Sequence, residues 1–296
     1  MRCRPTVYRF TGSTRAMHVL TIVCPDTTGI VAAVAGYLSA QGIFIDESSH
    51  FGDPQTRRFF MRTRFTPAGS FSRTAFAEGF RPIAERFGMQ WQVHDLKVLP
   101  RVLVMVSRHD HCLNDLLYRY RTGALAMQIP AIVSNHMDLA SLAEWHRVPF
   151  FHVPLTTETK PQAESRLLEI IDDTKAELIV LARYMQVLSP ALCERFPGRI
   201  INIHHSFLPG FKGAKPYFEA HARGVKLIGA TAHYVTADLD EGPIIEQSVE
   251  RVDHKQSVED LVAVGRDVEC LTLARAVKLH LEHRVFLNGR RTVVLR

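Results

Sequence analysis

Between residues 101 and 184 the sequence alternates apolar stretches of strand length with longer stretches of helical periodicity, and this alternation constrains the fold most. Strands are predicted at 101–106, 127–135, 150–154 and 176–184, with helices at 113–121, 139–147 and 162–174 between them. Parallel strands need such connections, because the chain must return to the same end of the sheet before the next strand begins. The pattern therefore predicts an α/β domain with a mostly parallel sheet.

The sequence after residue 184 extends this domain. Further strands are predicted at 201–204, 227–235 and 243–250, followed by a long helix at 257–283 and a closing hairpin around Asn288 and Gly289. An Asn-Gly pair favours the tight turn of a hairpin because both positions tolerate a positive φ.

The N-terminal part of the chain has a different order of elements. Strands are predicted at 17–23, 43–51, 57–65 and 89–95, and helices at 30–42 and 72–87. This βαββαβ order is typical of a ferredoxin-like sandwich. A chain of 296 residues exceeds the roughly 100–200 residues of most single domains. We therefore expect a tail at 1–16, a first domain at 17–97 and a second domain at 98–296.

Composition excludes several classes of protein. With 46% hydrophobic and 22% charged residues, the chain is typical of a globular protein, and no apolar run approaches the roughly 20 residues that span a bilayer. The five cysteines form no CxxC pair, which argues against structural zinc or a disulfide framework and favours the reducing cytoplasm. The net charge of +6 is dispersed, which favours a small anionic substrate over nucleic acid or a membrane.

The first sixteen residues contain four arginines and no acidic residue. They lack the apolar core of a secretory signal. We interpret them as a tail rather than a transit peptide.

The segment Asn202-Ile203-His204-His205 ends an apolar stretch and admits three interpretations: a metal site, an acid–base site, or an ordinary strand end. Alternate side chains of a strand share a face, so Asn202 and His204 project together, about 6.6 Å apart along the chain. His205 projects to the other face, and we interpret it as structural. A zinc site would need both histidines on one side, so the metal site is disfavoured.

A second polar segment follows downstream. A strand that carries His233 leads into a loop with Asp238, Asp240 and Glu241, and Gly242 and Pro243 then turn the chain into the next strand. A carboxylate beside an imidazole sets its charge state near neutral pH. The alternative is a solvated acidic turn.

Together, these two segments, NIHHSFLP and LDEGP, resemble the formyltransferase family, whose members use 10-formyltetrahydrofolate. The resemblance implies a Rossmann-like catalytic domain and a catalytic trio of Asn202, His204 and Asp240. It also implies a folate substrate bound by LARYMQVL and the acidic loop, without a further cofactor or a metal. The implied folate-binding residues are Met185, Gln186, Val187, Leu188, Ala237, Asp238 and Leu239, with His233 and Lys215 as possible supporting residues and Lys215 near the acidic tail of folate.

Near the N-terminus, the stretch CPDTTGIV within the βαββαβ order resembles an ACT domain, a small regulatory module. The resemblance implies an amino-acid effector at Asp26, Thr28, Gly29 and Ile30, and a homo-oligomer, either a dimer or a tetramer. From the residues alone, the favoured interpretation of the same stretch is a helix start whose free amides are capped by polar groups.

Members of the formyltransferase family pass the formyl group to glycinamide ribonucleotide, to initiator methionyl-tRNA or to water. The first acceptor needs a glycine-rich phosphate loop after the first strand, but residues 106–115 contain no glycine and carry Asp110. The second acceptor needs an added nucleic-acid-binding domain, which is usually C-terminal.

An N-terminal ACT-like module instead implies the branch of the family that hydrolyses the formyl group. This reaction would balance the one-carbon folate pool and supply formate for purine synthesis. Two alternatives remain: a formyltransferase with another amine acceptor, and a non-catalytic folate or amino-acid sensor.

Overall fold

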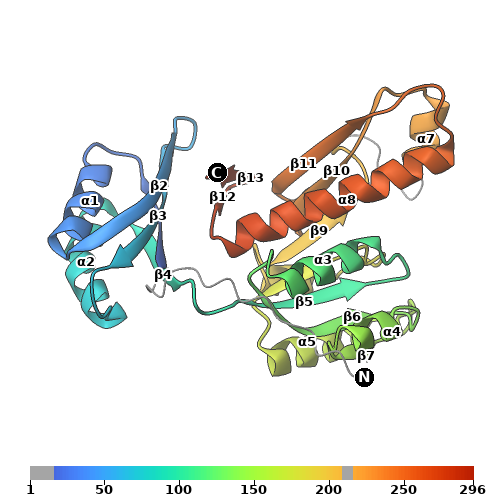
Figure 1. Ribbon diagram of the computed structural model, residues 1–296, viewed down its shortest axis with the longest axis horizontal. Helices are drawn as coiled ribbons and strands as arrows, with labels where there is room; N and C mark the ends of the chain where they lie inside the picture. The colour runs from blue at the N-terminus through green and yellow to red at the C-terminus, as the bar shows by residue number, and fades with distance from the viewer. Residues whose placement is uncertain (1–16, 209–215) are drawn as a thin grey trace, which may run out of the picture. The chain divides into compact units, whose positions relative to one another are not determined.

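The N-terminal residues build a small antiparallel sheet in a computed structural model that describes residues 17–208 and 216–296. The sheet has the strand order β2-β3-β1-β4, and the chain follows the βαββαβ order that the sequence predicts. Its elements are β1 (His18–Pro25), α1 (Ile30–Ala40), β2 (Ile43–Asp53), β3 (Arg58–Pro67), α2 (Arg73–Phe87) and β4 (Gln90–Asp95). Both helices cover the same face of the sheet, as Figure 1 shows.

The two faces of this sheet have different partners. Phe59, Met61 and Phe65 of β3 belong to the core beneath α1 and α2. Residues of the opposite parity project to the other face, and there Phe60 packs against Phe286 and Leu295 near the C-terminus. These C-terminal residues belong to a hairpin of β12 (Val285–Asn288) and β13 (Arg291–Val294). The end of the chain therefore covers part of the N-terminal sheet.

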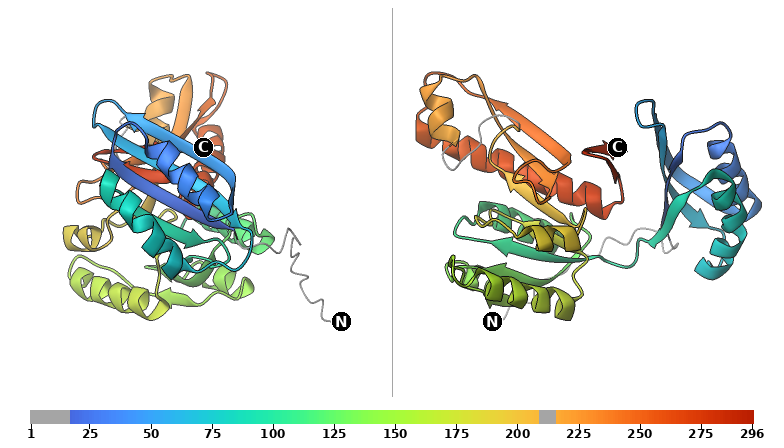
Figure 2. Two further views of the ribbon diagram at one scale, coloured as in Figure 1. Left: turned by 90° about the vertical axis from the view of Figure 1, so that its left-hand side faces the viewer. Right: turned by 180° about the vertical axis from the view of Figure 1, so that it is seen from behind.

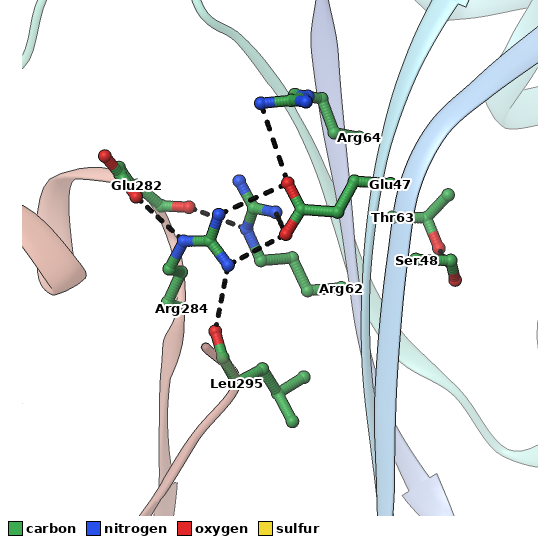
Figure 3. A network of polar contacts seen from close by, with 8 residues as sticks. All are labelled: Glu47, Ser48, Arg62, Thr63, Arg64, Glu282, Arg284 and Leu295. Atoms are coloured by element: carbon green, nitrogen blue, oxygen red, sulfur yellow. Dashed lines mark hydrogen bonds and ion pairs between the residues drawn. The ribbon is translucent and has the colours of Figure 1, made fainter.

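A cluster of charged residues fixes this C-terminal segment to the sheet (Figure 3). Arg284 Nη1 lies 2.9 Å from Glu47 Oε1, and it also donates a hydrogen bond to the Leu295 carbonyl at 3.1 Å. The Arg62 side chain is 2% exposed, and its Nε donates to the Glu282 carbonyl at 2.8 Å. Burial acts to raise the pKa of Glu47, but its arginine partners more than offset burial and lower it. The buried charges are thus paired, as burial requires.

The described residues divide into two compact units. One contains residues 17–99 together with 282–288 and 293–296, and the other contains 100–208, 216–281 and 289–292. Each unit has its own core.

The second unit is built on a larger sheet, which has seven strands in the described residues, in the order β11-β10-β9-β8-β5-β6-β7. The strands β7, β6, β5, β8 and β9 are parallel, whereas β10 and β11 run antiparallel to their neighbours. This confirms the predicted α/β fold with a mostly parallel sheet. Its strands are β5 (Arg101–Val106), β6 (Gln128–Ser134), β7 (Phe150–His152), β8 (Leu178–Leu181), β9 (Ile200–His204), β10 (Leu227–Tyr234) and β11 (Ile244–Arg251).

Helices cover the larger sheet. The longest, α8, runs along β9, β10 and β11 (Figures 1 and 2). The sequence pattern missed two short helices, α6 and α7, because one or two turns show no clear periodicity. The helices are α3 (His111–Thr122), α4 (Ala140–Trp145), α5 (Lys160–Thr174), α6 (Pro190–Arg195), α7 (Pro216–Ala222) and α8 (Val258–Leu281). Among the described residues, no helix combines the length and the apolar character needed to cross a membrane.

The strand order locates a ligand site. From β5 the chain proceeds outward to β6 and β7, and it then returns to β8 on the other side of β5. In open α/β sheets, ligands bind beyond the carboxyl ends of the strands at such a reversal. The carboxyl ends of β5 and β8 lead into residues 107–110 and 182–189.

Candidate active site

A cavity of about 270 Å³ lies beside the carboxyl ends of β8 and β9. Most of its lining comes from three segments, namely residues 181–188 from the end of β8, residues 202–205 at the end of β9, and residues 233–240 from the end of β10, and Cys193 adds to it. The predicted catalytic and folate-binding segments therefore meet at one pocket, although they are far apart in the sequence.

The pairing of β9 with β10 positions the first two polar side chains. In the antiparallel register Asn202 lies opposite His233. His233 Nδ1 lies 2.9 Å from the Tyr234 carbonyl, to which it donates its hydrogen. In the neutral ring Nε2 is then an acceptor, which matches the Asn202 Nδ2 amide 3.3 Å away. One of the two Nδ2 hydrogens remains for another acceptor.

The loop after β10 brings Asp240 to the histidines. Its Oδ2 lies 3.3 Å from His204 Nδ1, and its Oδ1 lies 3.7 Å from His233 Nε2. The hydrogen bond from His204, followed by the interaction with His233, holds the pKa of the Asp240 carboxyl well below its usual range. Asp240 is therefore a carboxylate at neutral pH, and its two oxygens face His204 Nδ1 and His233 Nε2.

The same loop depends on a close backbone approach. Asp240 has a φ of 57°, in the left-handed region that aspartate tolerates better than most residues. A Cβ on Gly242 would lie 1.7 Å from the Tyr234 carbonyl oxygen. Only glycine fits at this position, which returns the chain toward β10.

His204 is the most deeply placed group of the trio. It is 5% exposed, it lines the pocket, and its Nε2 has no hydrogen-bond partner in the described part of the chain. With Nδ1 directed to Asp240, Nε2 is the atom that can exchange a proton with a substrate.

His205 does not project away from the pocket, so this prediction from strand alternation is wrong. Strand β9 ends at His204, so the alternation does not continue to the next residue. The two imidazoles stack with centroids 5.1 Å apart and an interplanar angle of 26°. His205 also lines the pocket.

The seven predicted folate-binding residues all line the same pocket. Met185, Val187 and Leu239 are large apolar side chains that are 47%, 54% and 63% exposed. Exposed apolar groups beside a cavity suit the flat face of an aromatic ligand. His233 is placed with the trio, whereas Lys215 lies outside the described residues.

A buried polar cluster that the sequence did not predict lies next to the pocket. Glu269 of α8 is 1% exposed and lies close to Arg183, His111 and Tyr217. The available signal was a glutamate on the apolar face of α8, four residues before Leu273, which is fully buried.

Part of this cluster could also accept a metal ion. His111, Cys112 and Glu269 offer ligand atoms within 4.8 Å of one another. However, one Glu269 oxygen already accepts from Tyr217 and the other lies 2.8 Å from His111 Nε2. The Arg183 guanidinium 3.4 Å from Glu269 would also repel a cation.

The predicted effector residues lie at the start of α1. Gly29 is the N-cap, with a φ of 96°, and no side chain caps the helix. The stretch is therefore a helix start, as that interpretation predicts, but the prediction that polar side chains cap it is wrong. Asp26, Thr28 and Gly29 are exposed, whereas Ile30 is buried. A Cβ on Gly52 would lie 2.3 Å from Asp26 Oδ2, so the Asp26 carboxylate rests directly against the β2 backbone.

Comparison with known proteins identifies the family. The sequence profile of the formyl transferase family matches residues 100–277. A protein of Corynebacterium sp. (strain P-1) called formyltetrahydrofolate deformylase is 51% identical over 287 residues, which cover 96% of this chain and 100% of that protein. The chain belongs to the formyltetrahydrofolate deformylase family. A member of this family from Bacillus subtilis (strain 168) is 46% identical over 277 residues, covering 93% of this chain and 92% of its own.

Solved structures separate this family from the transferases. The formyltetrahydrofolate deformylase from Burkholderia mallei superimposes with a TM-score of 0.91 at 58% identity, over 95% of this chain and 100% of its own. Glycinamide ribonucleotide transformylase 1 from Symbiobacterium toebii gives 0.63 at 30% identity, over 67% of this chain and 95% of its own. A third of the chain therefore has no counterpart in that transferase, which is matched almost completely.

Proposed function

We propose that this protein hydrolyses 10-formyltetrahydrofolate to tetrahydrofolate and formate at the pocket that contains Asn202, His204 and Asp240. The observation that carries the proposal is the convergence of this trio, in a chain that matches deformylases over nearly its whole length. A carboxylate, an imidazole with a free Nε2 and an amide with a free hydrogen supply what hydrolysis of a formamide requires.

The roles follow from the charge that develops during the reaction. Water attacks the formyl carbon, and the carbonyl oxygen becomes an oxyanion that accepts from Asn202 Nδ2 and from protonated His204 Nε2. Asp240 stabilises the imidazolium through Nδ1 and positions or deprotonates the water. The C–N bond then breaks, and the departing folate nitrogen takes up a proton.

The substrate would lie along two segments of the pocket. The pterin would contact Met185, Gln186, Val187 and Leu188 on one side and residues 237–239 on the other. Lys215 is a candidate partner for the acidic tail of folate. This catalysis needs no metal or further cofactor, because the trio provides both the oxyanion donors and the acid–base group.

The N-terminal unit would regulate the reaction. Its βαββαβ fold, its exposed residues Asp26, Thr28 and Gly29, and the buried Ile30 that begins α1 fit an ACT-like module that binds an amino acid at this segment. Such modules pair through a second copy, so we propose a homo-oligomer, a dimer or a tetramer. We place the protein in the cytoplasm because its cysteines form no disulfide pattern.

The decisive experiment supplies 10-formyltetrahydrofolate without any amine and follows formate and tetrahydrofolate. We expect equal amounts of both products from the purified protein, and loss of both from His204→Ala. Bound but intact folate would contradict the proposal and favour a transferase or a sensor.

A further inference from the structure

Arg183 has an unusual backbone conformation at a critical point of the fold. It follows β8 closely and has a φ of 64°, a region that arginine rarely adopts. Such a conformation persists only when the surroundings hold it in place. The interactions of its side chain therefore carry information about its role.

The group that holds Arg183 is the buried carboxylate of Glu269. Arg183 Nε lies 3.4 Å from Glu269 Oε2, which is also 2.8 Å from His111 Nε2. Tyr217 donates its hydroxyl to Glu269 Oε1 at 2.7 Å. Burial acts to raise the pKa of Glu269, but His111, Arg183 and Tyr217 together leave it lowered. A buried charge of this kind is stable only with its partners in place.

The Arg183–Glu269 pair lies at one boundary of the active-site pocket. Arg183 lines the pocket, yet its side chain is 10% exposed and its Nε and Nη1 are closed to solvent. On the far side of the pair is His111, which follows the loop after β5. No residue of 107–111 is among the described residues that line this pocket, although the reversal of strand order predicts a ligand crevice between β5 and β8. The pair links a residue of the pocket wall, Arg183, to His111 on the β5 side.

We propose that Arg183, held by Glu269, closes the β5 side of the pocket and so restricts the attacking nucleophile to water. The inference rests on the proposed hydrolysis. With folate along residues 185–188 and 237–239, an amine acceptor would need its remaining atoms on the β5 side. Water needs a space of only about 10–15 Å³.

The two possible reactions differ in the bond that forms. Water forms a C–O bond with the formyl carbon, the C–N bond to folate breaks, and the products are formate, a proton and tetrahydrofolate. A primary amine forms a new C–N bond instead, loses one proton to the departing folate nitrogen, and yields an N-formyl amine with tetrahydrofolate. The ratio of N-formyl amine to formate therefore reports which nucleophile reaches the formyl carbon.

The test gives the full-length protein 10-formyltetrahydrofolate and glycinamide, a small primary amine, and quantifies formate and N-formylglycinamide by mass spectrometry. Arg183→Gly removes the side chain and suits the positive φ. Arg147→Gly is the matched control, because Arg147 is an exposed arginine with a φ of 58°. Arg183→Lys retains a charge and most of the bulk.

We expect the unsubstituted protein, Arg147→Gly and Arg183→Lys to produce formate with N-formylglycinamide at the level of the enzyme-free reaction. Arg183→Gly should raise the ratio of N-formylglycinamide to formate by about tenfold or more. A change of one small group in a pocket alters the discrimination between two substrates by at least about this factor. A change in folding alone would lower formate and leave N-formylglycinamide at the enzyme-free level, so the inference requires that the amount of N-formylglycinamide itself rises above that level.

An Arg183→Gly protein that releases formate with an unchanged ratio would overturn the inference. If that protein does not fold, the double variant Arg183→Gly/Glu269→Gln is used instead, because it removes both charges of the pair. The same ratio of N-formylglycinamide to formate is then measured. Absence of formate from the unsubstituted protein would instead overturn the hydrolase itself, so the two failures are distinguishable.

Discussion

Replacing Asp240 by asparagine tests the centre of the proposed site with little change of shape. Asparagine has the same size, tolerates the φ of 57° and keeps an oxygen to accept from His204 Nδ1. The substitution therefore removes the negative charge from two interactions, at 3.3 Å to His204 and at 3.7 Å to His233.

The expected loss can be worked out from these contacts. A hydrogen bond to a charged group contributes about 1.5–3 kcal/mol, and each 1.36 kcal/mol of barrier is a factor of ten. Loss of support for the imidazolium alone should lower kcat by about 10- to 150-fold. If Asp240 also activates the water, the loss should reach about 10⁴-fold.

The assay is kcat for formate release at saturating 10-formyltetrahydrofolate. Asp253→Asn is the control, because Asp253 lies on an exposed loop and is not among the residues that line the pocket. A folded Asp240→Asn protein with the kcat of Asp253→Asn would refute the assigned role.

Four further predictions follow from the geometry. Folding lowers the pKa of Asp240, so this carboxylate stabilises the wild type over Asp240→Asn. The difference in free energy of unfolding between the two proteins should be constant above the ordinary carboxyl pKa of 3.8 and should shrink as the pH falls below it. Acid denaturation curves that stay parallel would contradict this. Gly242→Ala should abolish activity and lower the Tm because its Cβ would overlap a carbonyl, whereas Gly36→Ala, in open space within α1, should raise stability by about 0.5–1 kcal/mol. Arg284→Ala should reduce hydrogen-exchange protection in β2 and β3 by the equivalent of about 1–3 kcal/mol, while Arg290→Ala, whose side chain is 81% exposed, should leave that protection unchanged. Dialysis against a chelator should leave the rate of formate release unchanged, and restoration of a lost rate by zinc would contradict a metal-free mechanism.

The sequence predicted the strands and long helices because their apolar periodicity is a local property. It also placed Asn202 and His204 together, since strand alternation requires no knowledge of the partner strand. It failed at His205, where the strand ends and alternation no longer applies. The local pattern therefore holds only as far as the element that produces it.

The positions of Asp240 and Glu269 could not be derived from a local pattern. The first reaches His204 through the β9–β10 register and a turn that requires Gly242, and it was predicted from a family resemblance. The second was hidden because a glutamate within a helix is usually solvated. Its burial depends on partners that come from three other segments of the chain. The roles of the trio and of the folate-binding residues stay predictions.

The packing of Phe286 and Leu295 against Phe60 has a consequence for how the protein is made. A ribosome releases the N-terminal sheet early, and domains generally fold as units while the chain emerges. Here one face of that sheet stays uncovered until residues 282–288 and 293–296 have been synthesised, because these segments complete the first unit. A nascent chain that has not yet reached residue 282 would expose Phe60, and its Arg62 would retain Glu47 but lack the Glu282 carbonyl.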